Sequence, residues 1–208
     1  MSMTSIVFSN IVFMLLSTNI FPQASGYDSG KPKATDLMVG ACKNASIYHY
    51  TATVPQEFCL STLQSDNRST QAKDLHDLVF IVMDITKGRV TAANDKVKKM
   101  VQNTQKGTVT MRVLTFCDVY YEELAGMLNV CDAMIKDYPG YKGQMRSEEL
   151  ALCVSTGYYS IIYCGDELHH MPKAEVLMKE NDELKMLVKM SANFLVPLEL
   201  RKEILFGH

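Results

Sequence analysis

The segment 117–131, CDVYYEELAGMLNVC, places two cysteines in the apolar stripe of a predicted helix. Tyr121, Leu124 and Leu128 follow Cys117 in steps of three and four residues, and Cys131 continues the series. Residues with this spacing lie on one face of an α-helix, so both sulfur atoms face the core together with the apolar side chains. The stripe extends from Leu114 to Ile135, which predicts a helix over about 109–136.

A second stripe with the same spacing follows the helix-breaking segment 137–142, DYPGYK, and it also contains two cysteines. Its members are Leu150, Cys153, Gly157, Ser160 and Cys164. Because the connection is short, the two helices are expected to be antiparallel neighbours. The small residues Gly157 and Ser160 would let their backbones approach closely.

Antiparallel packing brings Cys117 opposite Cys164 and Cys131 opposite Cys153. The registers of these two pairs differ by three residues, about 4.5 Å along the helix axis. Both pairs can therefore approach bridging distance, although not both in ideal register. We predict that these cysteines join the helices, and one alternative stays open: Cys131 and Cys153 are reduced thiols packed like small apolar side chains.

Two further segments have helical periodicity. One runs from Leu75 to Val101, with the stripe Leu75, Leu78, Val79, Val82, Ile85, Ala93, Val97 and Met100. In the other, Asn181 is expected to cap a helix with Leu184, Leu187, Val188, Ser191, Phe194 and Leu195 facing inward. Four helices with short connections predict an all-α, up-down-up-down four-helix bundle over about 70–200. Cys42 and Cys59 precede it, and they most simply bridge each other to close a hairpin-like segment over about 35–65.

The N-terminal region has the composition of a secretory signal peptide. Residues 1–26 contain no charged side chain, and a short apolar core at 11–16 precedes the small residues at its end. The segment is too short for a membrane span, although it lacks the usual Lys or Arg near its start. We expect a signal peptide at 1–26, a secreted mature chain over 27–208 and no membrane association.

Secretion favours disulfides over metal or redox chemistry for an even number of cysteines, and no C-x-x-C pair is present. The sequons at Asn44 and Asn67 become candidate glycosylation sites in that compartment. A net charge of −2 gives no basic field for nucleic acid. No nucleophile-elbow, zinc-protease or phosphate-loop motif occurs, so we expect no enzyme activity, cofactor or metal site.

The chain resembles the plant invertase and pectin methylesterase inhibitor family, including pollen-allergen-like members. The resemblance lies in ACKN at 41–44, FCLSTLQSD at 58–66, AKDL at 72–75, CDVY at 117–120, CGD at 164–166 and NDEL at 181–184. It implies an N-terminal helical hairpin with one disulfide before a four-helix bundle with a second. By position these are Cys42–Cys59 and Cys117–Cys164, and Cys131 and Cys153 are additions to the usual four cysteines. The sequence CGDEL at 164–168 departs from the family's usual end of the third helix.

The resemblance also implies a function and a contact site. Some invertase inhibitors present a Pro-Lys-Phe segment to the invertase active site. The matching residues here are Asp137, Tyr138, Pro139, Gly140, Tyr141 and Lys142, with glycine where the family has lysine. We therefore expect an inhibitor of acid invertase, located in the apoplast or vacuole, that acts as a monomer or weak dimer with a target enzyme as its partner.

Two other functions are compatible with the sequence. Pectin methylesterase is the second target that the family resemblance implies. A helical signalling ligand is the alternative of another class, although such bundles usually need long crossover connections, which this chain lacks.

Overall fold

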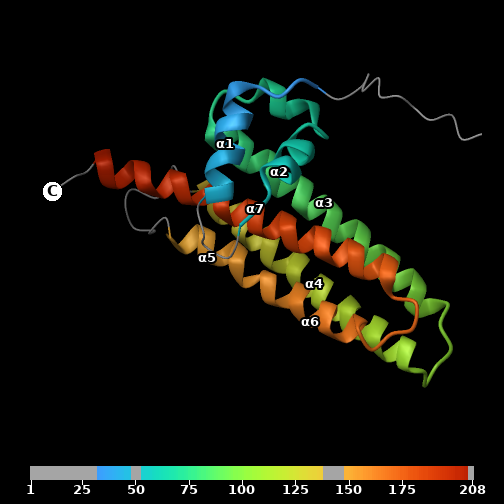
Figure 1. Cartoon of the computed structure of the whole chain (residues 1–208). Coiled ribbons are helices and arrows are strands. Elements are labelled where there is room, and N and C mark those ends of the chain that lie inside the picture. Colours follow the sequence, from blue (N-terminus) through green and yellow to red (C-terminus); the bar gives the residue numbers. More distant parts are fainter. Residues whose placement is uncertain (1–31, 48–52, 138–147, 206–208) are drawn as a thin grey trace, which may run out of the picture. The chain divides into compact units, whose positions relative to one another are not determined.

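The computed structural model describes residues 32–47, 53–137 and 148–205, and every regular element in these ranges is a helix (Figure 1). In chain order the elements are α1 (Asp36–Ile47), α2 (Gln56–Leu63), the short 3₁₀ helix η1 (Asn67–Gln71), α3 (Leu75–Gln102), α4 (Val109–Asp137), α5 (Glu148–Thr156), α6 (Tyr158–Leu168) and α7 (Glu175–Leu205).

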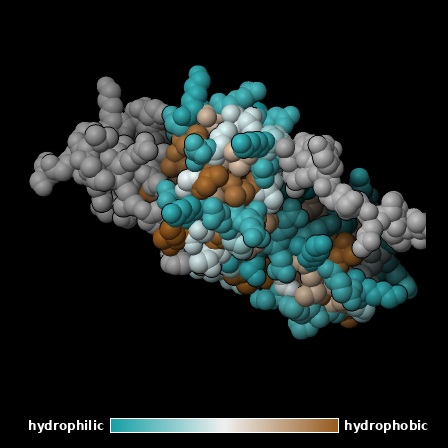
Figure 2. Space-filling view, turned by 45° about the horizontal axis from the view of Figure 1, so that its top comes forward, coloured by the Kyte–Doolittle hydropathy of each residue, from teal (hydrophilic) through white to brown (hydrophobic). Residues whose placement is uncertain are grey.

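The long helices form a closed bundle. Helix α3 packs against α4 and α7, α4 packs against α5 and α6, and both of these pack against α7. The fold is therefore the predicted disulfide-stapled all-α bundle, with α1 and α2 paired before it and α1 in contact with α7 (Figure 1). On the face drawn in Figure 2, hydrophobic residues occur in small patches between hydrophilic ones.

Polar residues at the helix ends explain where α3 and α4 begin. The Asp74 carboxylate accepts a hydrogen bond from the Asp77 amide at 3.0 Å, which satisfies a free N–H in the first turn of α3. The Thr108 hydroxyl accepts from the Met111 amide at 3.1 Å at the start of α4. Gly107 has φ +80°, a left-handed conformation that glycine adopts without steric cost, and it turns the chain between the two helices.

The stripe predicted for α4 is correct, whereas that of α3 includes unexpected polar residues. Every member of the α4 stripe is buried: Leu114, Cys117, Tyr121, Leu124, Leu128, Cys131 and Ile135. In α3, Ile85 and Met100 are only half-buried, and Thr86 is fully buried. The Thr86 hydroxyl lies 2.9 Å from the buried Ser191 hydroxyl of α7 and donates to the Val82 carbonyl or to Ser191. This pairing makes a polar core position tolerable.

The third helix of the bundle is two helices, α5 and α6, which corrects the single helix expected from the sequence. The interruption falls at Gly157, where an added Cβ atom would lie 2.6 Å from Cδ1 of Leu124 on α4. Gly157 therefore permits the close approach of α4 that the sequence led us to expect. A side chain at this position would require the Leu124 side chain to shift.

The expected role of Asn181 as a helix cap is wrong. Helix α7 begins at Glu175, six residues earlier, and Asn181 is a buried residue of its interior. Its side-chain amide donates to the Ile161 carbonyl at 3.1 Å and its oxygen accepts from the Tyr121 hydroxyl at 2.9 Å. These partners belong to α6 and α4, so the Asn181 side chain is hydrogen-bonded without the free backbone amides at the start of a helix.

Candidate functional site

The contact residues predicted from the sequence fall at a boundary of the described structure. Asp137 is the last residue of α4 and is exposed. Tyr138, Pro139, Gly140, Tyr141 and Lys142 lie outside the described residues. The described part of this candidate site is therefore its stem, the last turns of α4 and the first turns of α5.

A disulfide joins the two sides of this stem. Cys131 of α4 and Cys153 of α5 are bridged, with Cα atoms 5.7 Å apart. Cys131 lies six residues before the end of α4, and Cys153 lies five residues after the start of α5. All six cysteines of the chain are bridged, so the alternative of two reduced thiols does not describe this structure. The bridge fixes the spacing of the two helix ends that flank the segment 138–147.

An ion-pair cluster supports the α4 side of the stem. The buried Asp132 carboxylate accepts from Lys87 of α3 at 2.9 Å and from Lys136 at 2.7 Å. Burial raises the pKa of Asp132, but the hydrogen bonds from Lys136 and Lys87 outweigh it, and the pKa lies below its ordinary value. Asp132 is therefore ionised at neutral pH and links the last turns of α4 to α3.

The second interhelical disulfide joins α4 to α6, toward the other end of α4. Cys117 of α4 and Cys164 of α6 are bridged with Cα atoms 4.7 Å apart, and both residues are fully buried. One turn after Cys117, the Tyr121 hydroxyl donates to Asn181. Burial and, secondarily, the negative charge of Glu180 raise the pKa of Tyr121, so this hydroxyl keeps its proton.

Gly165 makes room for this polar network. A Cβ atom at Gly165 would lie 2.8 Å from the Asn181 amide nitrogen, which donates to the Ile161 carbonyl one turn earlier on α6. The glycine in CGDEL, where the sequence departs from the family pattern, thus gives Asn181 access to the α6 backbone.

The N-terminal hairpin is fixed by the third disulfide and by one long-range hydrogen bond. Cys42 of α1 and Cys59 of α2 are bridged with Cα atoms 5.6 Å apart. The buried Asn193 of α7 donates to the Ala45 carbonyl of α1 at 2.9 Å, which ties the hairpin to the bundle. The sequon residues Asn44 and Asn67 are both exposed on this part of the molecule.

One cluster has the composition of a cation site. Ligand atoms of Asp74, His76 and Asp77 lie within 4.8 Å of one another at the start of α3. Both carboxylates already have partners, however, because Asp74 accepts from the Asp77 amide and Asp77 accepts from the Lys73 amide at 2.8 Å. These hydrogen bonds identify the cluster as the N-terminal cap of α3.

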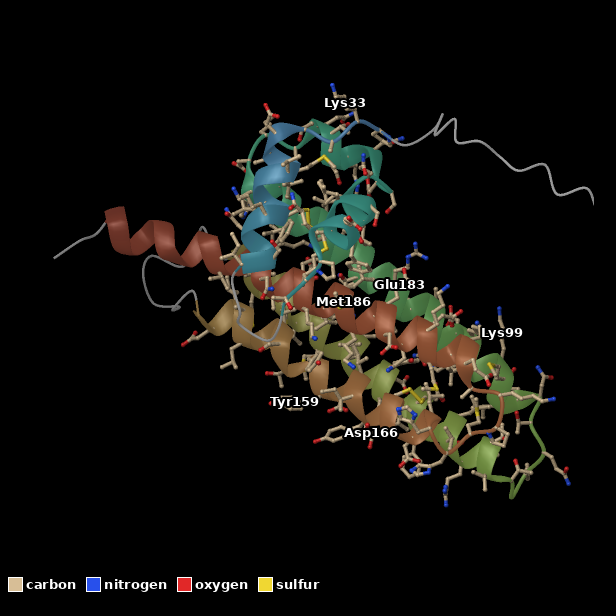
Figure 3. All side chains as sticks on the ribbon, in the orientation of Figure 1. Lys33, Lys99, Tyr159, Asp166, Glu183 and Met186 are labelled. Carbon is tan, nitrogen blue, oxygen red and sulfur yellow. A yellow bond between two sulfur atoms is a disulfide. The ribbon has the colours of Figure 1, made fainter. Side chains whose placement is uncertain are left out.

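A row of apolar side chains at the surface of α4, α5 and α6, here called the aromatic strip, was not predicted from the sequence. Its members are the exposed Phe116 and Val130 and the half-buried Tyr120 of α4, with the exposed Leu152 of α5 and Tyr159 and Tyr163 of α6. Figure 3 shows Tyr159 projecting outward from α6. The available signal was the spacing of these residues, which places them beside the core stripe rather than in it.

The described residues form a helical bundle stapled by three disulfides. The family profile described as plant invertase/pectin methylesterase inhibitor matches residues 36–196, and the chain belongs to this family. Members of the family are inhibitors rather than enzymes, act on a target enzyme and are typically extracellular. No match to a curated protein was found. None of the described helices combines the length and apolar character of a membrane span.

Proposed function

We propose that the protein is a secreted inhibitor of acid invertase that has no hydrolytic activity of its own. Family membership supports an inhibitor of invertase or pectin methylesterase. The choice of invertase depends on the segment 137–142, which keeps the proline and an aromatic residue of the invertase-contacting segment that the family resemblance implies.

The observation that carries this proposal is the disulfide between Cys131 and Cys153. The bridge constrains the ends of α4 and α5, which flank the proposed contact segment. The Cα atoms of Cys131 and Cys153 are 5.7 Å apart. Fixing the ends of a segment reduces the number of conformations that it adopts before binding. Fewer conformations are then lost on binding, so the entropic cost of association is lower. The second bridge, between Cys117 and Cys164, holds α4 against α6 farther along the bundle.

Within the segment, Tyr138 and Tyr141 are the proposed anchors. From the sequence, we expect Pro139 to fix its own φ and to bias Tyr138 towards extended conformations. Aromatic residues are enriched among binding hot spots, where truncation costs about 2 kcal/mol or more.

The test measures residual activity of a purified acid invertase and a purified pectin methylesterase, each with increasing amounts of the mature protein. We expect inhibition of invertase, and expect the change of Tyr138→Ala with Tyr141→Ala to weaken it at least roughly tenfold without loss of helicity. The variant Val176→Ala, an exposed apolar residue at the start of α7, is the control. Inhibition of pectin methylesterase alone would change the target, and sucrose hydrolysis by the pure protein would refute the inhibitor assignment.

The same proposal includes signal-peptide cleavage, localisation and glycosylation of the chain. Residues 1–26 are a signal peptide, the mature protein is apoplastic or vacuolar, and Asn44 and Asn67 carry glycans. The exposure of both asparagines supports this. Mass spectrometry of protein secreted from plant cells checks the cleavage position and both glycans, and sedimentation distinguishes a monomer from a weak dimer.

A further inference from the structure

The aromatic strip is continuous across two helices. Phe116 and Tyr120 have ring centroids 6.4 Å apart, and Tyr120 lies 5.6 Å from Tyr163 across the α4–α6 contact. Tyr159 precedes Tyr163 by one turn of α6. Farther along, the Ser160 hydroxyl donates to the Glu123 carboxylate at 3.3 Å, which shows that α4 and α6 stay adjacent beside Tyr159.

All members of the strip except the half-buried Tyr120 are exposed to an extent that core packing does not explain. Phe116 is 42% exposed, Tyr159 59%, and Tyr163 51%. At the other end, Val130 and Leu152 are 60% and 54% exposed, next to the bridged Cys131 and Cys153. Single apolar residues on a surface are ordinary, but a contiguous row marks a surface for interaction.

The charges that α4, α5 and α6 place beside the strip are mostly acidic. The basic exceptions are Arg112, one turn before Phe116, and Lys189 of α7, which lies over the Tyr158 ring. The stretches 113–135 and 148–168 contain no Lys, Arg or His, whereas α3 alone has Lys87, Arg89, Lys96, Lys98 and Lys99. Glu122 and Asp132 are neutralised by Lys98 and Lys87 of α3. On the strip side, Glu123, Asp166 and Glu167 form no ion pair with any described residue. Figure 3 shows Asp166 on the same outer edge of α6 as Tyr159.

We propose that the aromatic strip binds a cationic amphipathic helix of another protein. The apolar face of such a helix would cover the exposed rings, and its basic side chains would pair with Glu123, Asp166 and Glu167. Anionic lipid, nucleic acid and a second copy of the same acidic face are disfavoured by charge repulsion. From Phe116 to Val130 the strip follows fourteen residues of α4, about 21 Å, which is the length of a helix of about four turns.

The probe is an 18-residue synthetic helix of leucine and lysine on opposite faces, and the control peptide has glutamate in place of lysine. Binding to the full mature protein is measured by fluorescence anisotropy over a range of salt concentrations. We expect saturable binding of the basic peptide alone, weakened by salt because the charges near the strip are exposed.

Three variants locate the binding surface. The double change Tyr159→Ser with Tyr163→Ser should weaken binding roughly tenfold through loss of buried apolar area. The triple change Glu123→Gln, Asp166→Asn and Glu167→Gln should remove most of the salt dependence. Val176→Ser, equally exposed but on α7, should change neither. Circular dichroism of each variant verifies that the bundle is folded.

Several results would overturn the proposal. They are equal binding of the acidic peptide, equal loss in the Val176→Ser variant, and absence of binding to the unmodified protein. A concentration-dependent dimer that the tyrosine changes abolish, without peptide binding, would assign the strip to a second copy of the chain. None of these readouts depends on invertase or pectin methylesterase, so the inhibitor proposal is tested separately.

Discussion

The two disulfides that join α4 to the α5–α6 pair have different surroundings. The bridge between Cys117 and Cys164 is fully buried and lies one helical turn from the Tyr121–Asn181 hydrogen bond. The bridge between Cys131 and Cys153 is half-buried on its α5 side and lies near the helix ends that flank the segment 138–147. The first belongs to the core, and the second holds the stem of the proposed contact segment.

This comparison shows that the same covalent bond serves two purposes. Both bridges restrict the unfolded chain, and the restriction grows with the length of the closed loop. The core bridge closes the longer loop, with a sequence separation of 47 against 22. The stem bridge is the one whose loss should alter the proposed inhibition, because it directly spaces the ends of the contact segment.

The largest effect is expected from removing the core bridge. The change Cys117→Ala with Cys164→Ala should lower the free energy of unfolding by about 3.5 kcal/mol, because the intact stem bridge shortens the loop that the core bridge closes. The change Cys131→Ala with Cys153→Ala should lower it by about 3 kcal/mol, also from loop-closure entropy. Urea unfolding followed by circular dichroism measures both values. For a given loss of stability, the variant that lacks the stem bridge should lose more inhibition than the variant that lacks the core bridge. A stem variant that is less stable than the core variant would contradict the comparison.

A smaller effect is expected from the hydrogen bonds beside the core bridge. Asn181→Leu leaves the buried Tyr121 hydroxyl without its partner and should lower the free energy of unfolding by about 1–3 kcal/mol. Adding Tyr121→Phe should recover part of that loss, because the unpaired hydroxyl is then absent. Urea unfolding of the four combinations measures the coupling, with Asn129→Leu at an exposed position of α4 as the control. Strictly additive losses would show that the two side chains are not coupled.

The smallest effect is expected for the contribution of Asp132, in the stem, to the pH dependence of stability. Because the pKa of Asp132 is lowered in the folded protein, its ion pairs contribute stability above the unfolded pKa of about 3.9, and this contribution is lost as pH falls through the folded pKa. Asp132→Asn should therefore flatten the decline in stability below about pH 4. Thermal unfolding between neutral and acidic pH measures it. An unchanged pH profile would mean that Lys87 and Lys136 do not stabilise the stem through this carboxylate.

Much of the fold follows from local periodicity. The stripe from Leu114 to Ile135 predicts which face of α4 is buried, and the positions of the cysteines on two adjacent helices predict the bridges that the structure contains. Both inferences work because side chains at steps of three and four residues share a helix face in any tertiary context. The family, too, was recognisable from the cysteine order and the short motifs around it.

The candidate site was less accessible to sequence reasoning. The segment 137–142 was selected by resemblance alone, and its contact with an enzyme stays a proposal. The aromatic strip was missed because Tyr163 is 43 residues from Tyr120 in the sequence and becomes its neighbour only when α4 and α6 pack together.

The sequence by itself determined α3 and α4, the buried face of α4 and which cysteines face each other across the bundle, because these depend on the periodicity of one helix or on the register of two. It left open whether Cys131 and Cys153 are bridged. The tertiary structure alone decided the roles of Asn181 and Gly157. A buried asparagine is tolerated within α7 because Tyr121 and Ile161 come from other helices to satisfy it. The interruption at Gly157 coincides with the close approach of Leu124 from α4. Contacts of this kind depend on the relative positions of three helices, which no local pattern specifies.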